Sequence, residues 1–229
     1  MLIDIYNMLF REYGPQSWWP GDGPLDVVIG AILTQNTSWS NVEKAIRNLK
    51  YSDLWSLESI HNINQDKLAV VIRPSGYFNQ KARKLKAFSE HVYVRYEGDL
   101  ENFLSLELPM LREELLSIYG VGPETADDIL VYAASKPSFI VDVYTKRILG
   151  RIGVIEAKQG VGYEVYQKLI QDQLPHDVQL YNEFHALLDY HAKYTCKKIP
   201  SCTDCLLLDV CDSGQVWIIE GNDKAIIHY

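Results

Sequence analysis

Residues 116–130 read LSIYGVGPETADDIL and join two amphipathic segments through a Gly-Val-Gly turn. Apolar residues recur at three- and four-residue spacing on both sides of the turn, which predicts two helices. Pro123 stands where the second helix would begin, and there its missing N–H costs nothing. Gly120 and Gly122 allow left-handed backbone angles and carry no side chain that would block a close approach. The stretch therefore predicts a helix-hairpin-helix.

A hairpin of this kind can bind phosphate. The backbone N–H groups of Gly120, Val121 and Gly122, with those of the following helix, can hold a phosphate without any Lys or Arg. This explains how an acidic stretch could still contact DNA. The same sequence would also suit a plain helix–turn–helix connection, and the turn alone leaves that alternative open.

The charges of the chain are unevenly placed. The 229 residues contain 22 Lys and Arg against 30 Asp and Glu, a net charge of −8, which argues against a general nucleic-acid-binding surface. Residues 73–95, which include Lys81, are mostly basic, whereas residues 97–128 are mostly acidic. The basic run predicts either a face that follows DNA phosphates or simply a solvated helix face.

Helical spacing continues along most of the chain, and convincing alternation at period two is absent. The further predicted helices are 25–34, 41–49, 80–94, 143–151, 161–173 and 181–192. We therefore expect an all-α protein of about ten helices. No apolar run approaches the ~20 residues of a membrane-spanning helix, and the N-terminus does not resemble a secretion signal. These features predict a soluble, intracellular protein.

Asp142 ends the apolar stretch 139–141 and precedes a predicted helix. An aspartate in this place is typically a helix N-cap, because its side chain accepts a backbone N–H of the first turn. The functional interpretation is a carboxylate directed from the helix start into a cleft beside the hairpin.

All four cysteines lie within 196–211, as CKKIPSCTDCLLLDVC, with gaps of five, two and five residues. Disulfides are disfavoured in the reducing compartment that the absence of a secretion signal indicates. Structural zinc usually needs two cysteine or histidine knuckles, and only the pair Cys202 and Cys205 has that spacing. Four thiolates at short intervals favour a 4Fe–4S cluster held by Cys196, Cys202, Cys205 and Cys211.

The hairpin, the aspartate and the terminal cysteines, in this order, resemble the helix-hairpin-helix DNA glycosylase superfamily and its endonuclease III-like iron–sulfur branch. The resemblance implies two helical domains with a DNA cleft between them, one of residues 22–136 and one of residues 1–21 plus 137–229. It implies that Asp142 is the catalytic carboxylate, that the hairpin binds DNA phosphate and that Gln35 fills the gap left by a flipped nucleotide. The first cysteine gap is one residue shorter than usual in the family.

Glu124 departs from the bifunctional members of that family, which carry a lysine nucleophile at this position. A carboxylate cannot form the Schiff base that permits strand cleavage. The sequence therefore predicts a monofunctional glycosylase, in which Asp142 stabilises the sugar cation and activates water.

The N-terminal part resembles the branch typified by 3-methyladenine DNA glycosylase III. Its matching segments are Trp18-Trp19-Pro20, 33–37 (LTQNT) and 73–82 (RPSGYFNQKA), of which the last includes Lys81. A base pocket formed with Trp18, Trp19 and Glu124 would stack on a positively charged base, which favours alkylated purines. Paired tryptophans are also common in protein cores.

Two other functions remain open. One is a mismatch thymine or uracil glycosylase, or an adenine glycosylase, of the same fold. The other is a non-catalytic helix-hairpin-helix DNA-binding protein or an iron–sulfur electron carrier. The expected partner is double-stranded DNA containing a damaged base, with no membrane association. We expect a monomer in the cytoplasm of a prokaryotic-type cell, where it would act on the DNA of the nucleoid.

Overall fold

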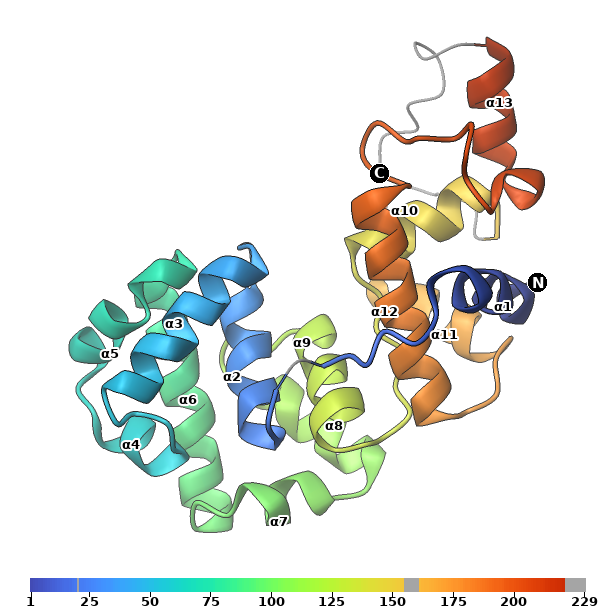
Figure 1. Cartoon of the computed structure of the whole chain (residues 1–229). Helices are drawn as coiled ribbons and strands as arrows, with labels where there is room; N and C mark the ends of the chain where they lie inside the picture. Colours follow the sequence, from blue (N-terminus) through green and yellow to red (C-terminus); the bar gives the residue numbers. More distant parts are fainter. Residues whose placement is uncertain (20, 155–160, 221–229) are drawn as a thin grey trace. The chain divides into compact units, whose positions relative to one another are not determined.

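The computed structural model describes residues 1–19, 21–154 and 161–220, and in these ranges all regular structure is helical. The all-α prediction is confirmed. The chain separates into two compact units, shown in Figure 1. Unit 1 consists of residues 1–18 and 137–229, and unit 2 of residues 19–136, whereas the predicted domain began at residue 22. In the described ranges no helix is long and apolar enough to cross a membrane.

Unit 2 is built around α2 (Pro24–Thr34), which is buried along almost its whole length, as expected for a helix that is apolar all round. In Figure 1 it lies against α3, α6 and α9 and the π-helical turn η2. The other elements of unit 2 are α3 (Trp39–Tyr51), α4 (Leu57–Asn62), α5 (Gln65–Val71), η1 (Arg73–Ser75), α6 (Phe78–Tyr96), α7 (Leu100–Ser105), α8 (Leu108–Ser117), α9 (Pro123–Asp128) and η2 (Ile129–Ala133).

Unit 1 is built around α12 (Val178–Tyr194), which packs against α1 and α10 (Figure 1). Its core is mainly aliphatic and contains a group of aromatic rings, in which Phe139 meets Tyr181 and Phe184 edge-on, with centroids 5.4 and 5.8 Å apart. The remaining elements of unit 1 are α1 (Leu2–Tyr13), α10 (Val143–Ile152), α11 (Tyr163–Gln171), η3 (Leu208–Val210) and α13 (Asp212–Glu220).

The helix predicted after the Gly-Val-Gly turn is interrupted. α9 ends at Asp128, and residues 129–133 continue as a π-helical turn in which the Ala134 N–H donates to the Ile129 carbonyl at 2.9 Å. Such turns widen a helix by one residue and are frequent near functional sites. Here the turn packs against α2, next to the hairpin that precedes α9.

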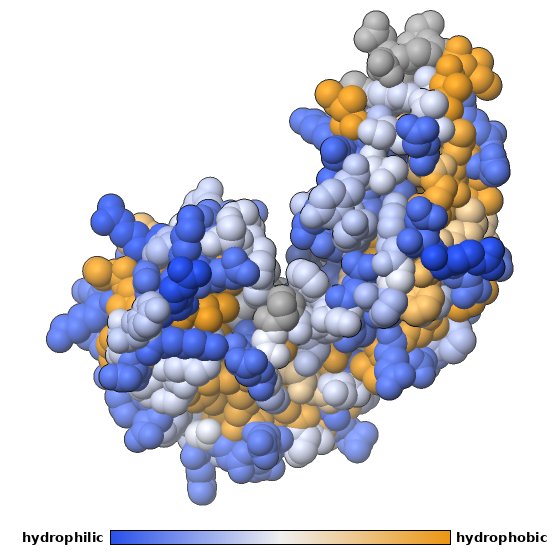
Figure 2. Space-filling model, in the orientation of Figure 1, coloured by the Kyte–Doolittle hydropathy of each residue, from blue (hydrophilic) through white to orange (hydrophobic). Residues whose placement is uncertain are grey.

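The surface is mostly polar in the view of Figure 2, and apolar side chains gather over α13. Val216, Ile218 and Ile219 of this helix are exposed, whereas Trp217 is buried. Helix α13 directly follows Cys211. It therefore has one apolar face turned inward, which contains Trp217, and another exposed, which contains Val216, Ile218 and Ile219.

Candidate DNA-binding and catalytic residues

The turn between α8 and α9 is a tight hairpin. The Val121 N–H donates to the Ile118 carbonyl at 3.1 Å, and the Ala126 N–H donates to the Gly122 carbonyl at 2.9 Å as α9 begins. The Val121 side chain is buried in the core of unit 2. Pro123 is the first residue of α9, as its place in the sequence predicted.

The two glycines of the hairpin have different roles. Gly120 has φ +85°, and a Cβ on it would lie 2.6 Å from Lys84 Cδ. Gly122 has φ −95° and ψ 177°, which is extended backbone, so the left-handed conformation that a glycine allows is not used at this position. Apart from its two chain neighbours, no atom of the described residues lies within 4 Å of where a Gly122 Cβ would be. Gly120 is needed for the turn itself, and Gly122 leaves open space beside it.

An ion pair joins the two helices of the hairpin. Arg112 of α8 donates from Nε to Asp127 Oδ1 at 2.9 Å and from its terminal nitrogen to Asp127 Oδ2 at 3.1 Å. The Asp127 side chain is fully buried and that of Arg112 is largely so. Two parallel bonds fix both the distance and the angle between α8 and α9.

Gln35 lies beside the hairpin. It follows the last residue of α2, and its side-chain amide donates to the Gly120 carbonyl at 3.2 Å and to Thr125 Oγ1 at 2.9 Å. Lys84 donates to Gln35 Oε1. The structure thus brings the predicted gap-filling residue and the predicted phosphate-binding turn together.

Lys81 lies inside unit 2, with only 2% of its surface exposed. Its ammonium group donates to the Leu33 carbonyl at 2.8 Å and to the Ser75 carbonyl at 2.6 Å. Burial, with a smaller contribution from the charge of Lys84, lowers the pKa of Lys81 to about 8. We therefore assign Lys81 to the packing of unit 2 and correct the predicted DNA contact.

Other members of the basic run 73–95 are also engaged within unit 2. The Lys86 ammonium donates to the carbonyls of Ile60 at 3.2 Å and Ile63 at 2.9 Å, where α4 ends. The Arg83 guanidinium lies over the Tyr119 ring, 4.0 Å from its centroid. The run is therefore used in large part for helix capping and ring contacts.

Asp142 is the N-cap of α10, and its Oδ1 accepts the Thr145 N–H at 2.7 Å. Its side chain is about 14% exposed, and Oδ2 lies 3.9 Å from His185 Nε2. Burial lowers the pKa of His185, so this imidazole is neutral at neutral pH. In the described ranges Oδ2 accepts no hydrogen bond, so one carboxylate oxygen caps the helix and the other remains available.

Trp18 and Trp19 belong to different units. Lys193 lies over the Trp18 ring, 5.7 Å from its centroid, within unit 1. The Trp19 indole packs on Gly30 of α2, where a Cβ would lie 2.7 Å from Trp19 Cζ2. Pro20, the last residue of this segment, lies outside the described residues. The structure does not bring the two indoles together within one unit.

Trp19 has aromatic neighbours that sequence reasoning missed. Trp39 of α3 meets it edge-on with centroids 5.3 Å apart, and Tyr132 of η2 lies at the same centroid distance. No local pattern marks these residues as a group, because α3 and η2 are far apart in the sequence. Glu124, the other predicted pocket residue, is exposed at the second position of α9.

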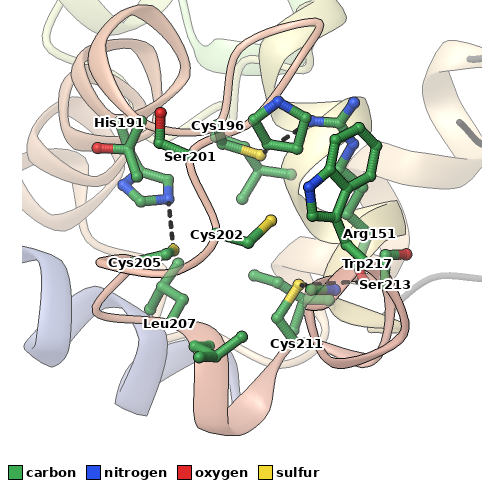
Figure 3. Close-up of a pocket in the computed structure, with 16 residues that line it drawn as sticks. Arg151, His191, Cys196, Ser201, Cys202, Cys205, Leu207, Cys211, Ser213 and Trp217 are labelled. Carbon is green, nitrogen blue, oxygen red and sulfur yellow. Dashed lines mark hydrogen bonds between the residues drawn. The ribbon is translucent and has the colours of Figure 1, made fainter. Parts of the chain in front are cut away.

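All four cysteines line one pocket, shown in Figure 3. Its walls come from the cysteine segment and from α10, α12 and α13, and include Arg151, His191 and Trp217. All four cysteines are free thiols. The described residues contain no preformed group of three or more His, Cys, Asp or Glu side chains with metal-binding geometry.

Two of the cysteine sulfurs accept hydrogen bonds from neighbouring residues, and the Cys211 thiol also donates to the Arg151 carbonyl at 3.4 Å. The Arg151 guanidinium donates to Cys196 Sγ at 3.3 Å, and the Gly214 N–H donates to Cys211 Sγ at 3.3 Å. Burial raises the pKa of the Cys205 thiol to about 11 and raises those of Cys202 and Cys211. Buried thiols of this kind lose their protons readily only to a bound metal, so the residues present fit a four-thiolate metal group.

Comparisons with known proteins agree on the family. Residues 29–173 match the model of the HhH-GPD superfamily base excision DNA repair proteins. A protein of Methanocaldococcus jannaschii, named as a candidate DNA repair glycosylase, is 45% identical over 92% of this chain and 96% of its own length.

Two solved structures extend the comparison. The 3-methyladenine DNA glycosylase MagIII of H. pylori, bound to 1,N6-ethenoadenine, is 31% identical with a TM-score of 0.71, over 84% of this chain and 97% of its own. An endonuclease III in a non-covalent DNA complex is 21% identical with a TM-score of 0.80, over 95% and 98%. This chain belongs to the HhH-GPD superfamily of base excision DNA repair proteins and is a DNA glycosylase of that family.

Proposed function

We propose that the protein is a monofunctional glycosylase that releases alkylated purines, such as 3-methyladenine, from double-stranded DNA. Two features support this substrate class. One is the likeness to MagIII, whose solved complex holds a modified adenine. The other is the group of aromatic rings in unit 2, where Trp19 lies 5.3 Å from both Trp39 and Tyr132 between ring centroids. An alkylpurine that carries positive charge is attracted to aromatic faces.

The Asp142 carboxylate is the observation that carries the proposed chemistry. Because Oδ1 is held by the Thr145 N–H at 2.7 Å, the carboxylate has a fixed orientation. Its Oδ2 is available to face the sugar of a flipped nucleotide. As the bond between C1′ and the base nitrogen breaks, the electron pair leaves with the base, and the carboxylate stabilises the positive charge that develops on the sugar.

Water completes the reaction. Asp142 accepts a proton as a water oxygen bonds to C1′, and the products are the free base and an abasic site. A base that is already cationic is a good leaving group without protonation, so a single carboxylate suffices. His185 is neutral, and it therefore does not neutralise the negative charge of Asp142.

Glu124 supports the monofunctional assignment. It occupies the second position of α9, where the bifunctional relatives carry an amine. A carboxylate cannot form an imine with C1′ and so cannot promote strand cleavage by that route. In this proposal the exposed Glu124 side chain is a base-pocket residue of unit 2.

The four cysteines complete the proposal as ligands of a 4Fe–4S cluster. Cys196, Cys202, Cys205 and Cys211 would hold the cluster, which would stabilise the C-terminal segment and would take no part in base release. Arg151 and the Gly214 N–H would then donate to the bound thiolates.

The test is a panel of duplexes that contain 3-methyladenine, 1,N6-ethenoadenine, a T·G mismatch or a U·G mismatch. Free base is measured by chromatography, and strand breaks are measured before and after hot alkali. We expect release of the alkylated bases, with strands that break only after alkali. Release of thymine or uracil alone would contradict the substrate assignment, and covalent trapping with borohydride would contradict the monofunctional one.

A further inference from the structure

The side chain of Gln35 is fixed in the free protein. The residue leaves α2 with φ −54° and ψ 118°, and Asn36 after it has a left-handed φ of +53°. Both hydrogens of the Gln35 amide nitrogen are used, one toward the Gly120 carbonyl at 3.2 Å and one toward Thr125 Oγ1 at 2.9 Å. The amide is therefore held against the hairpin.

Lys84 touches both partners of this contact. Its ammonium group donates to Gln35 Oε1, and its methylene groups lie so close to Gly120 that a Cβ there would overlap them. Burial lowers the pKa of Lys84. One side chain of α6 thus supports both the predicted gap-filling residue and the hairpin glycine.

The chemistry of these groups allows one orientation of the amide. An ammonium group can only donate, so it must face Oε1, and the Gly120 carbonyl can only accept, so it must face Nε2. A flipped amide would place Nε2 against the Lys84 ammonium group, which is donor against donor. It would also place Oε1 against the Gly120 carbonyl, which is acceptor against acceptor. Lys84 therefore determines which end of Gln35 faces away from the hairpin.

We propose that Lys84 is a positioning residue that orients Gln35 and joins it to the hairpin at Gly120, so that both engage DNA as one preformed surface. The proposal rests on the proposed function, because Gln35 is there the residue that fills the space left by the flipped nucleotide. Fixing a side chain before binding removes the entropy that would otherwise be lost in the complex.

The surroundings of Lys84 fit this role. It lines an open pocket of about 330 Å³ with Gln35, Asn36 and Gln80 and with the tyrosines at 77 and 119. The lining consists of amide, hydroxyl and ammonium groups and includes no carboxylate. Nothing in the pocket would compete with the Gln35 oxygen for Lys84 by offering a stronger ion pair.

A double-mutant cycle tests whether Lys84 acts through Gln35. The variants are Lys84→Met, which keeps the length of the stem, Gln35→Ala and the combination of both. The matched control is Lys67→Met, which removes an exposed lysine of α5 in the same unit. The measurement is the Kd for a duplex with a stable abasic-site analogue, and circular dichroism confirms that each variant is folded.

We expect Lys84→Met and Gln35→Ala each to raise Kd about 5- to 10-fold, with the double variant no weaker than Gln35→Ala alone, because residues that act together are not additive. Lys67→Met should leave Kd within about twofold. Multiplied effects in the double variant would show that Lys84 contacts DNA by itself and would overturn the proposal, as would an unchanged Kd for Lys84→Met.

A second measurement does not depend on DNA. The side-chain amide signals of Gln35 in a ¹⁵N NMR spectrum of the whole chain are assigned by their loss in Gln35→Ala. In the wild type they should exchange slowly with water, and Lys84→Met should accelerate the exchange severalfold. Unchanged exchange would overturn the inference. If the wild type showed no preference for the abasic duplex, the proposed function would fail while these signals still decided the role of Lys84.

Discussion

Lys81 donates from inside unit 2 to the Leu33 and Ser75 carbonyls, at 2.8 and 2.6 Å. These carbonyls stand at the end of α2 and in the turn before α6, so one ammonium group joins two segments of the unit. Removing it leaves two buried acceptors without this donor. We expect Lys81→Met to lower the free energy of unfolding by roughly 2 kcal/mol at pH 7, measured by urea unfolding. Unchanged stability would contradict this assignment.

The same lysine predicts a dependence on pH. In the folded protein its pKa is lowered to about 8 from its ordinary value of 10.5, so between these values only the unfolded chain holds the proton. The penalty for burying the charge is therefore present below pH 8 and is lost as the pH rises toward 10.5. The advantage of the wild type over Lys81→Met should grow across this window in urea unfolding. A constant or shrinking difference would argue against a buried ammonium group.

The site residues that local sequence could identify are those fixed by their neighbours in the chain. Gly120 and Pro123 were predictable because a tight turn and a first helical position require those residue types. The partners of Gln35 and the burial of Lys81 were not predictable. They depend on contacts between α2, α6 and the hairpin, which are separated by some tens of residues. The local sequence around a lysine in a basic run does not show whether its ammonium group faces solvent or a buried carbonyl.

At the scale of an element, the hairpin predicts that substitution of Gly120 lowers stability, whereas substitution of Gly122 lowers DNA binding. Gly120→Ala forces a left-handed residue and an overlap with Lys84, so it should cost about 1–2 kcal/mol or more in folding stability. Gly122→Ala meets open space at an extended φ and should leave thermal stability nearly unchanged while it weakens duplex binding. Thermal melts and duplex titrations measure the two effects. Full DNA affinity in Gly122→Ala would show that the open space does not receive DNA.

The Arg112–Asp127 pair carries a second prediction for this element. Arg112→Met keeps most of the packing but leaves the buried Asp127 carboxylate without its two bonds to the guanidinium. Loss of one partner of a buried pair costs about 3–5 kcal/mol. Chemical denaturation should show a loss of this size, because the angle between α8 and α9 is no longer fixed. A loss below about 1 kcal/mol would mean that the pair is not important for the hairpin.

Most of the longer helices were predicted from their apolar periodicity. The ranges expected around α2, α3, α6, α10 and α12 differ from the observed bounds by no more than three residues at either end. Helices α1, α4, α5, α7 and α13 were not predicted. The six or seven residues of α4, α5 and α7 contain too few apolar repeats to define a period, whereas α1, with 12 residues, was long enough and was missed. The π-helical turn after α9 was not predicted from the sequence.

At the scale of the whole molecule, the prediction concerns the metal content of the protein and its effect on stability. We expect the protein, purified without oxygen, to contain about four iron atoms per chain and to be yellow-brown, since four thiolates are the ligands of a 4Fe–4S cluster. Cys202→Ser should lower the thermal midpoint, because cluster binding contributes to folding, whereas Ser201→Ala beside it should not. Iron analysis, visible absorbance and thermal melts are the measurements. One zinc per chain and no colour would contradict the cluster.

The central claim is that the Asp142 carboxylate releases a cationic base from DNA, and one comparison tests it most directly. Asp142 and Asp177 are both N-cap residues whose Oδ1 accepts a backbone N–H at 2.7 Å, and only Asp142 is assigned to catalysis. Asparagine preserves the cap in either place. The measurement is the release of free 3-methyladenine from methylated duplex DNA by the wild type, Asp142→Asn and Asp177→Asn, with binding to an abasic-analogue duplex measured in parallel. We predict that Asp142→Asn loses at least 100-fold in rate while it still binds, and that Asp177→Asn matches the wild type. Equal release by Asp142→Asn would contradict the account.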